Sequence, residues 1–204
     1  MGFFDELRMP GGDDDDHDYS TPEWLEAPED FVAGVVPVEL VLGRSDEAAV
    51  FITRIAAYPV GFEFDAELVT REPTRGDHFE LMHDPDRPRD EIPPELVRLG
   101  VAFADGRRTT SLGSPLGGST MTTLVATDED ESPDPARDIY MTSGGGSGSA
   151  RRSTTSYWVW PLPPPGPLTF ACEWPKFGID EGTAEVDATI VREAAGRALS
   201  VWSE

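Results

Sequence analysis

The chain has 204 residues, of which 38% are hydrophobic, and it contains 20 glycines and 19 prolines. Its formal net charge is −23 and its sequence pI is about 4.3, so it repels nucleic-acid phosphates and anionic membrane surfaces. These values predict one domain with additional irregular segments, and they exclude nucleic acid and membranes as expected partners.

Two further observations concern the compartment. The sequence shows no signal-peptide pattern and no apolar stretch near the roughly 18 residues of a membrane span. Cys172 is the only cysteine, so an internal disulfide and the usual cysteine-based zinc sites are excluded. We therefore expect a cytoplasmic protein.

Residues 1–30 form an acidic arm that we expect to be disordered, because like charges and prolines dominate it. Trp24 and Leu25 are the exception within this arm. This apolar pair could dock on the chain's own domain or on a partner, and docking on the chain's own domain is the simpler interpretation.

Alternating apolar residues predict antiparallel strands over residues 36–43, 48–58, 60–71 and 97–103. In the third of these, Glu63, Asp65 and Glu67 occupy the polar face. Asp105-Gly106 predicts a hairpin turn, after which Arg107 and Arg108 begin the return strand.

Two later segments have other patterns. Acidic, glycine and serine residues predict a flexible insertion at about residues 113–155. Apolar residues at four-residue spacing predict an amphipathic helix at about residues 184–202, with Thr183 as its N-cap. We expect this helix to cover an open side or end of the sheets.

The stretch YWVWPLPPPGPLTFACEWP, residues 157–175, predicts two strands joined by a rigid proline-rich connection, which we interpret as a core hairpin. Trp158 and Trp160 share one strand face, and Tyr157 and Val159 share the other. Both faces are therefore expected to be covered. The alternative is an exposed aromatic patch that binds a partner.

This stretch also carries a resemblance. Together with the helix sequence DATIVREAAGRA and the upstream FADGRRTT, it resembles a group of uncharacterised proteins of high-GC Gram-positive bacteria. The similarity covers the expected folded part, residues 36–202. It implies a bacterial cytosolic setting and no activity, cofactor or site residue.

The candidate chemical sites each have a simpler structural interpretation. Cys172 could be a nucleophile, but its strand face predicts a buried thiol. His78 and His83 could bind a metal, but their spacing matches no zinc motif. The carboxylates of residues 63–67 are expected to be neutralised from adjacent strands by Arg54, Arg98, Arg107 or Arg108. The sequence thus predicts no catalytic residue, no metal and no cofactor.

We expect a mainly β fold, an antiparallel immunoglobulin-like sandwich of about six to eight strands with a C-terminal helix, over residues 31–204. The expected function is a non-enzymatic protein-binding or adaptor module, whose partner has a basic surface. Candidate partner-binding residues are Trp24, Leu25, Trp158 and Trp160.

Two alternatives remain open. One is a small-ligand-binding domain or enzyme that uses Glu63, Asp65 and Glu67 with Arg107 or Arg108, which requires these groups to converge in one pocket. The other is an acidic charge mimic that inhibits a basic protein.

Overall fold

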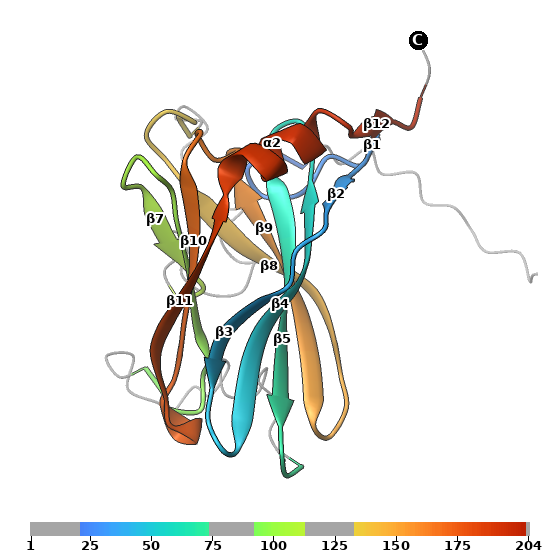
Figure 1. Cartoon of the computed structure of the whole chain (residues 1–204). Coiled ribbons are helices and arrows are strands. Elements are labelled where there is room, and N and C mark those ends of the chain that lie inside the picture. The colour runs from blue at the N-terminus through green and yellow to red at the C-terminus, as the bar shows by residue number, and fades with distance from the viewer. Residues whose placement is uncertain (1–20, 74–91, 113–132, 203–204) are drawn as a thin grey trace, which may run out of the picture.

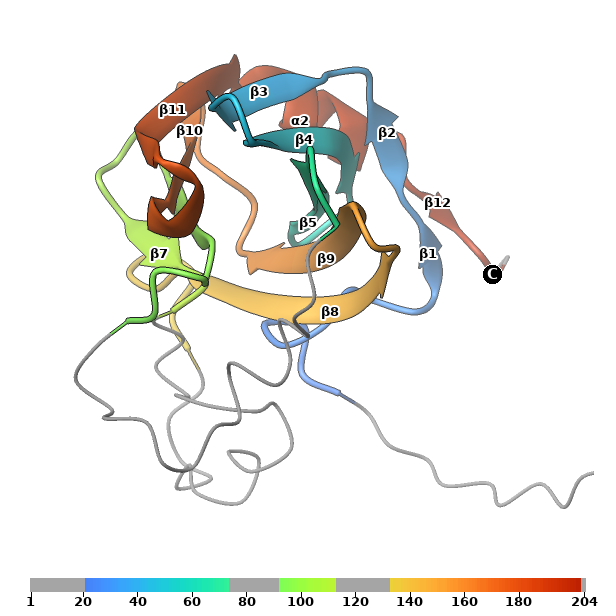
Figure 2. The ribbon, with the colours of Figure 1, turned by 90° about the horizontal axis from the view of Figure 1, so that it is seen from below.

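A computed structural model describes residues 21–73, 92–112 and 133–202 of the chain. These residues form a mainly antiparallel β structure with twelve strands in three sheets and one short C-terminal α-helix. None of the three sheets closes on itself within these ranges. In Figure 2 the two larger sheets curve around a common interior.

The larger sheet has six strands in the order β2-β4-β5-β9-β8, and β3 also pairs with β4. In β5 every second residue is buried along the whole strand, as its sequence alternation predicts. The opposite residues of β5 form a polar outer face. The six strands are β2 (Gly34–Val36), β3 (Leu40–Arg44), β4 (Ala48–Ala57), β5 (Phe62–Thr70), β8 (Tyr140–Gly148) and β9 (Arg152–Trp160).

The second sheet has four strands in the order β11-β10-β6-β7. Gly106 has φ 92° and turns the chain between β6 and β7, as the Asp-Gly pair predicts. Arg108 begins the return strand. The four strands are β6 (Arg98–Ala102), β7 (Arg108–Thr110), β10 (Pro167–Trp174) and β11 (Ile179–Asp187).

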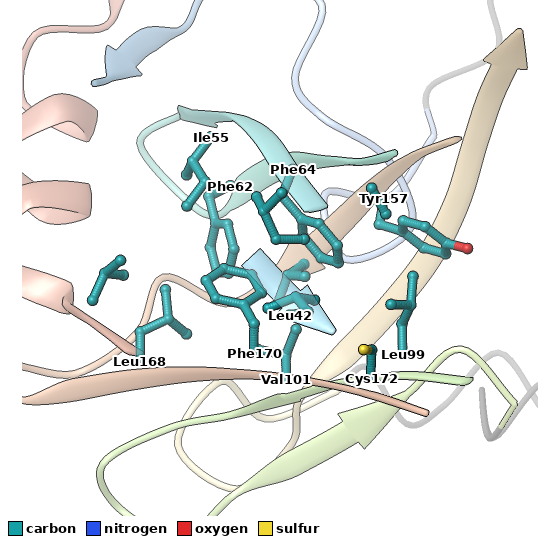
Figure 3. Packing of buried hydrophobic residues seen from close by; sticks show 14 of the residues in the cluster. Leu42, Ile55, Phe62, Phe64, Leu99, Val101, Tyr157, Leu168, Phe170 and Cys172 are labelled. Carbon is teal, nitrogen blue, oxygen red and sulfur yellow. The ribbon is translucent and has the colours of Figure 1, made fainter. Parts of the chain in front are cut away.

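A hydrophobic core lies between the two larger sheets. Phe62 and Phe64 of β5 meet Phe170 of β10, with ring centroids 6.4 Å and 5.2 Å apart. Figure 3 shows these rings with Tyr157, which stacks on Phe64 at 5.2 Å. Aromatic side chains from both sheets therefore join the sheets at the centre.

The aromatic stretch does not form the expected hairpin. β9 pairs with β5 and β8, whereas β10 pairs with β6 and β11 in the other sheet. Residues 161–166, which include four prolines, carry the chain across from one sheet to the other. Because proline has no N–H to donate, this connection leaves the ladder instead of folding back along it.

The glycine- and serine-rich residues near 140–155 form strands instead of the expected flexible insertion. β8 pairs with β9 from Tyr140 to Gly148, and the pairing shifts register between Ser143 and Gly146. Main-chain hydrogen bonds hold this hairpin, although most β8 side chains after Met141 are exposed. The part of the predicted insertion at residues 113–132 lies outside the described residues, as do residues 1–20 of the arm.

The C-terminal helix is shorter than expected. α2 covers Ala188–Ala195, because residues 184–187 still pair with β10 as the end of β11. Asp187, rather than Thr183, caps it by accepting a hydrogen bond from the Thr189 N–H at 2.9 Å. Figure 1 shows α2 lying across one end of the two larger sheets.

The remaining sheet pairs β1 (Phe31–Val32) with β12 (Leu199–Ser200). The expected number of six to eight strands is too low, in part because β1, β2 and β12 have only two or three residues and were not predicted as separate strands. Strands of this length are too short to show an alternation in the sequence.

Candidate functional site

The outer face of β5 carries a network of paired charges. The Arg54 guanidinium on β4 lies 3.0 Å from the Glu63 carboxylate and 3.4 Å from that of Asp65. Ser156 Oγ on β9 donates to Asp65 at 2.7 Å, and Tyr58 Oη donates to Glu63 at 3.4 Å. Three adjacent strands therefore hold these two carboxylates in place.

The other charged candidates lie elsewhere. Glu67 pairs with Arg152 at 2.8 Å, nearer the end of β5. Arg107 lies in the four-stranded sheet's turn and pairs with Asp105 at 2.7 Å, while Arg108 is exposed on β7. The structure thus brings Arg54, and neither Arg107 nor Arg108, to the carboxylate strand.

A short part of the arm lies on the same outer face. We call residues 21–27 the docked segment; in Figure 2 it runs beside β8 before the chain reaches β1. The Leu25 N–H donates to the Pro22 carbonyl at 2.9 Å, which makes a turn. This turn places Leu25 against the sheet with 8% of its surface exposed, and Trp24 against Tyr140 with ring centroids 5.3 Å apart.

Two side chains of the sheet hold the main chain of the docked segment. Trp158 Nε1 donates to the Glu23 carbonyl at 3.0 Å. Thr142 Oγ1 donates to the Leu25 carbonyl at 2.8 Å. The sheet therefore binds this segment as a receptor binds a peptide, through main-chain oxygens and one buried apolar side chain.

A cavity of about 840 Å³ lies between the docked segment and the sheet. The docked segment forms one wall, and strands β4, β5, β8 and β9 form the rest. We call the cavity and the surface under the docked segment the groove. The cavity is lined by Thr21, Leu25, Glu26, Ala27, Arg54, Glu63, Asp65, Thr142, Ser143, Gly144, Gly145, Gly146, Ser147, Thr154, Ser156, Tyr157 and Trp158.

The cavity lining is acidic. The residues that line it include three acidic ones, Glu26, Glu63 and Asp65, and one arginine, Arg54, for a formal charge of −2. Arg54 contacts one oxygen of Glu63 and one of Asp65, which leaves the second oxygen of each carboxylate for other donors. Electrostatics therefore favour a cationic group in this cavity.

The four predicted partner-binding residues come together around this groove. Trp158 is 4% exposed and Trp160 is 3% exposed, so with Leu25 three of the four are buried while the segment is docked. Tyr140 joins the cluster, because its ring lies 6.2 Å from Trp160 as well as beside Trp24. Contact of these side chains with a partner remains a prediction.

Cys172 is 2% exposed on the inner face of β10, and burial raises the pKa of its thiol to about 11. A thiol in this state is a poor nucleophile near neutral pH. His78 and His83 lie outside the described residues. Among the residues that the structure describes, no group of three or more histidine, cysteine, aspartate or glutamate side chains could hold a metal ion.

Several groove residues were not among the sequence candidates. Ser156 shares a strand face with Trp158 by two-residue alternation, so this signal was present in the sequence. Thr142 and Tyr140 had no comparable signal, because their stretch reads as glycine- and serine-rich coil. Their roles depend on the pairing of β8 with β9.

Comparison of the chain with protein-family models, with curated proteins and with solved structures finds no match. Within residues 21–73, 92–112 and 133–202, no helix is long and apolar enough to cross a membrane. Arguments about function therefore start from the geometry of the groove.

Proposed function

We propose that this protein is a non-enzymatic protein-binding or adaptor module, and that the groove is its binding site. One observation carries the proposal: the outer face of β8 and β9 already holds a peptide, the docked segment, through the Trp158 and Thr142 hydrogen bonds and buried Leu25. A surface that binds a segment in cis has the shape and donors to bind a similar one from a partner.

The charges in the groove support binding more than chemistry. Glu63 and Asp65 both pair with Arg54, and Asp65 also accepts from Ser156. These ion pairs and hydrogen bonds hold both carboxylates in fixed positions across the sheet. These groups are suited to fixing the position of a ligand.

The cavity favours a second candidate, the binding of a small cationic ligand. Its volume falls within the usual range for small-molecule sites, roughly 300–1,000 Å³. Arg54 would replace Arg107 and Arg108 in this version of the hypothesis, and Glu67 does not line the cavity. A thermal-shift screen of amines and guanidines against the full chain and its Glu63→Gln variant tests it.

The distribution of charge weakens the third hypothesis, the charge mimic. Residues outside the described ranges carry 18 acidic and 4 basic side chains, a net −14, which leaves −9 of the total −23 for the described residues. Several described carboxylates also pair with arginine. Mimicry of nucleic acid needs a dense array of unpaired negative charge, and the described residues, with a net charge of −9 and several paired carboxylates, do not favour one.

We extend the proposal to the finer fold and the setting. The two larger antiparallel sheets, with one core between them and a crossover from β9 to β10, support an immunoglobulin-like sandwich. A single cysteine and the resemblance to proteins of high-GC Gram-positive bacteria support a bacterial cytoplasmic location. The net charge of −23 favours a protein partner with a basic surface and disfavours nucleic acid and membranes.

A quantitative pull-down from a bacterial lysate tests the proposal. The baits are the full chain, its Leu25→Ala variant, which loosens the docked segment, and Trp202→Ala as a control at a position 74% exposed and outside the groove. We expect the Leu25→Ala bait to capture a partner more strongly than the wild-type bait does. A peptide of residues 21–29 should displace that partner. A partner lost with Trp202→Ala and indifferent to the peptide would place binding elsewhere and contradict the groove.

A further inference from the structure

The docked segment shows which features of a peptide the groove recognises. The turn from Pro22 to Leu25 directs one leucine side chain into the sheet, where it is 8% exposed. The preceding tryptophan lies on Tyr140. A ligand with the same turn, ending in an aromatic residue and a leucine, would make the same contacts.

The hydrogen bonds add affinity without restricting the sequence further. Both are accepted by main-chain carbonyls, those of Glu23 and Leu25. Any residue can supply such an oxygen, so a segment of another protein with the same turn can make the same two bonds. Neither bond depends on the side chain of Glu23.

The position after the leucine, Glu26, is exposed and adds a negative charge to the cavity lining. Glu26 lines the same acidic cavity as Glu63 and Asp65, and Arg54 is the one basic residue in that lining. Like charges in one cavity repel, so Glu26 weakens the docking of its own segment. A lysine or arginine at this position would instead bring a positive charge to a lining that holds the two carboxylates of β5.

We propose that the groove binds partner segments in which a turn ends in an aromatic residue and a leucine and a basic residue follows, and that the chain's own segment is a weaker occupant that such a partner displaces. This inference rests on the proposed function and names its ligand class. Charge complementarity and the fit of the docked segment itself identify the ligand.

A partner can displace the docked segment only if that segment has a low intrinsic affinity for the groove, because its covalent attachment gives it a high local concentration. A short tether produces an effective concentration in the millimolar range, which any free peptide must overcome. Glu26 reduces that advantage, whereas a basic residue in the partner increases its affinity. The wild-type chain should therefore bind free peptides more weakly than a variant whose own segment is loosened.

Fluorescence anisotropy with labelled peptides of residues 21–29 tests the inference. The peptides carry the natural sequence, Glu26→Lys, or Leu25→Ala as a matched control. The proteins are the full wild-type chain and full chains with Leu25→Ala or Trp24→Ala. Thermal melting identifies the folded variants, and Trp24→Ala serves if Leu25→Ala does not fold.

We expect the loosened chains to bind at least about tenfold tighter than the wild type, since the cis competitor is removed. They should prefer the Glu26→Lys peptide about fivefold at low salt, the scale of one partly exposed ion pair. High salt and Glu63→Gln in the protein should each reduce that preference. The Leu25→Ala peptide should bind at least tenfold more weakly.

Three results would overturn the inference. The first is no binding of any peptide at 1 mM, the concentration scale that the tether sets. The second is equal affinity for the natural and Glu26→Lys peptides, and the third is undiminished binding of the Leu25→Ala peptide. The outcome is separable from that of the proposed function. If a partner is captured from the lysate but these peptides do not bind, the proposed binding module is supported and the proposed ligand class is contradicted.

Discussion

Replacement of Leu25 by alanine measures how strongly the docked segment is held. The side chain is 8% exposed, and alanine removes three of its carbon atoms from the sheet surface. At about 0.8 kcal/mol per buried CH₂ group, the loss is about 2 kcal/mol. The groove borders an open cavity, so solvent can replace the lost atoms, and the larger cost of a sealed core cavity does not apply.

A loss of about 2 kcal/mol shifts the equilibrium between docked and released segment about 30-fold, since 1.4 kcal/mol is a factor of ten. Hydrogen exchange of the amides in residues 21–27 should therefore become about 30-fold faster. The Trp158 indole proton should also change its NMR shift, because its acceptor is the Glu23 carbonyl.

Val35→Ala is the matched control, because this valine is 63% exposed on β2 and lies outside the groove. It removes apolar atoms without touching the docked segment, so exchange of residues 21–27 should not change. If Leu25→Ala leaves both the exchange of those amides and the indole shift at their wild-type values, Leu25 does not anchor the segment and the groove argument fails.

Three other predictions concern the sheets. Burial raises the pKa of Tyr157 to about 12 from 10.0, so its contribution to stability is present below pH 10 and is lost as the pH rises through 12. Tyr157→Phe should therefore flatten the fall in Tm over that range; an equal fall in both proteins would assign it to other groups. Arg54→Ala should lower the free energy of unfolding by about 1 kcal/mol at low salt, because Glu63 and Asp65 lose the cation that they share, and high salt should reduce the difference. Urea unfolding at low and at high salt checks this, and a loss of equal size under both conditions would point to packing instead. Gly182→Ala would place a Cβ 2.2 Å from a main-chain oxygen of β3, so we expect the free energy of unfolding to fall by about 1–3 kcal/mol or more. The matched variant Gly145→Ala should lower it by less than about 0.5 kcal/mol, because a Cβ at that position meets no atom within 4 Å. Equal urea midpoints for these two variants would show that β3 can move away freely.

The sequence was most informative where strands are long and one face is buried. The alternation from Phe62 to Leu68 predicted both the buried side of β5 and its carboxylate face, because side-chain direction in a strand follows directly from position. Asp105-Gly106 predicted its turn for an equally local reason, the positive φ of Gly106. Such features depend on neighbours within a few residues.

Other features depended on pairing between distant segments. Residues 143–148 have little side-chain bulk, so the main-chain ladder with β9 is what makes them a strand. Residues 184–187 have helical spacing in sequence, yet pairing with β10 keeps them extended. In both places tertiary hydrogen bonds outweighed local propensity, which is worth less than about 1 kcal/mol per residue.

The groove divides in the same way. The sequence by itself determined that Trp24 and Leu25 form an apolar pair in an acidic arm and that Trp158 and Trp160 share a strand face. Only the tertiary structure decided that the pair lies on that face, with Arg54 and Asp65 beside it and a cavity between. The physical reason is that the polarity and spacing of side chains are local properties, whereas a binding site requires contacts between residues more than a hundred positions apart.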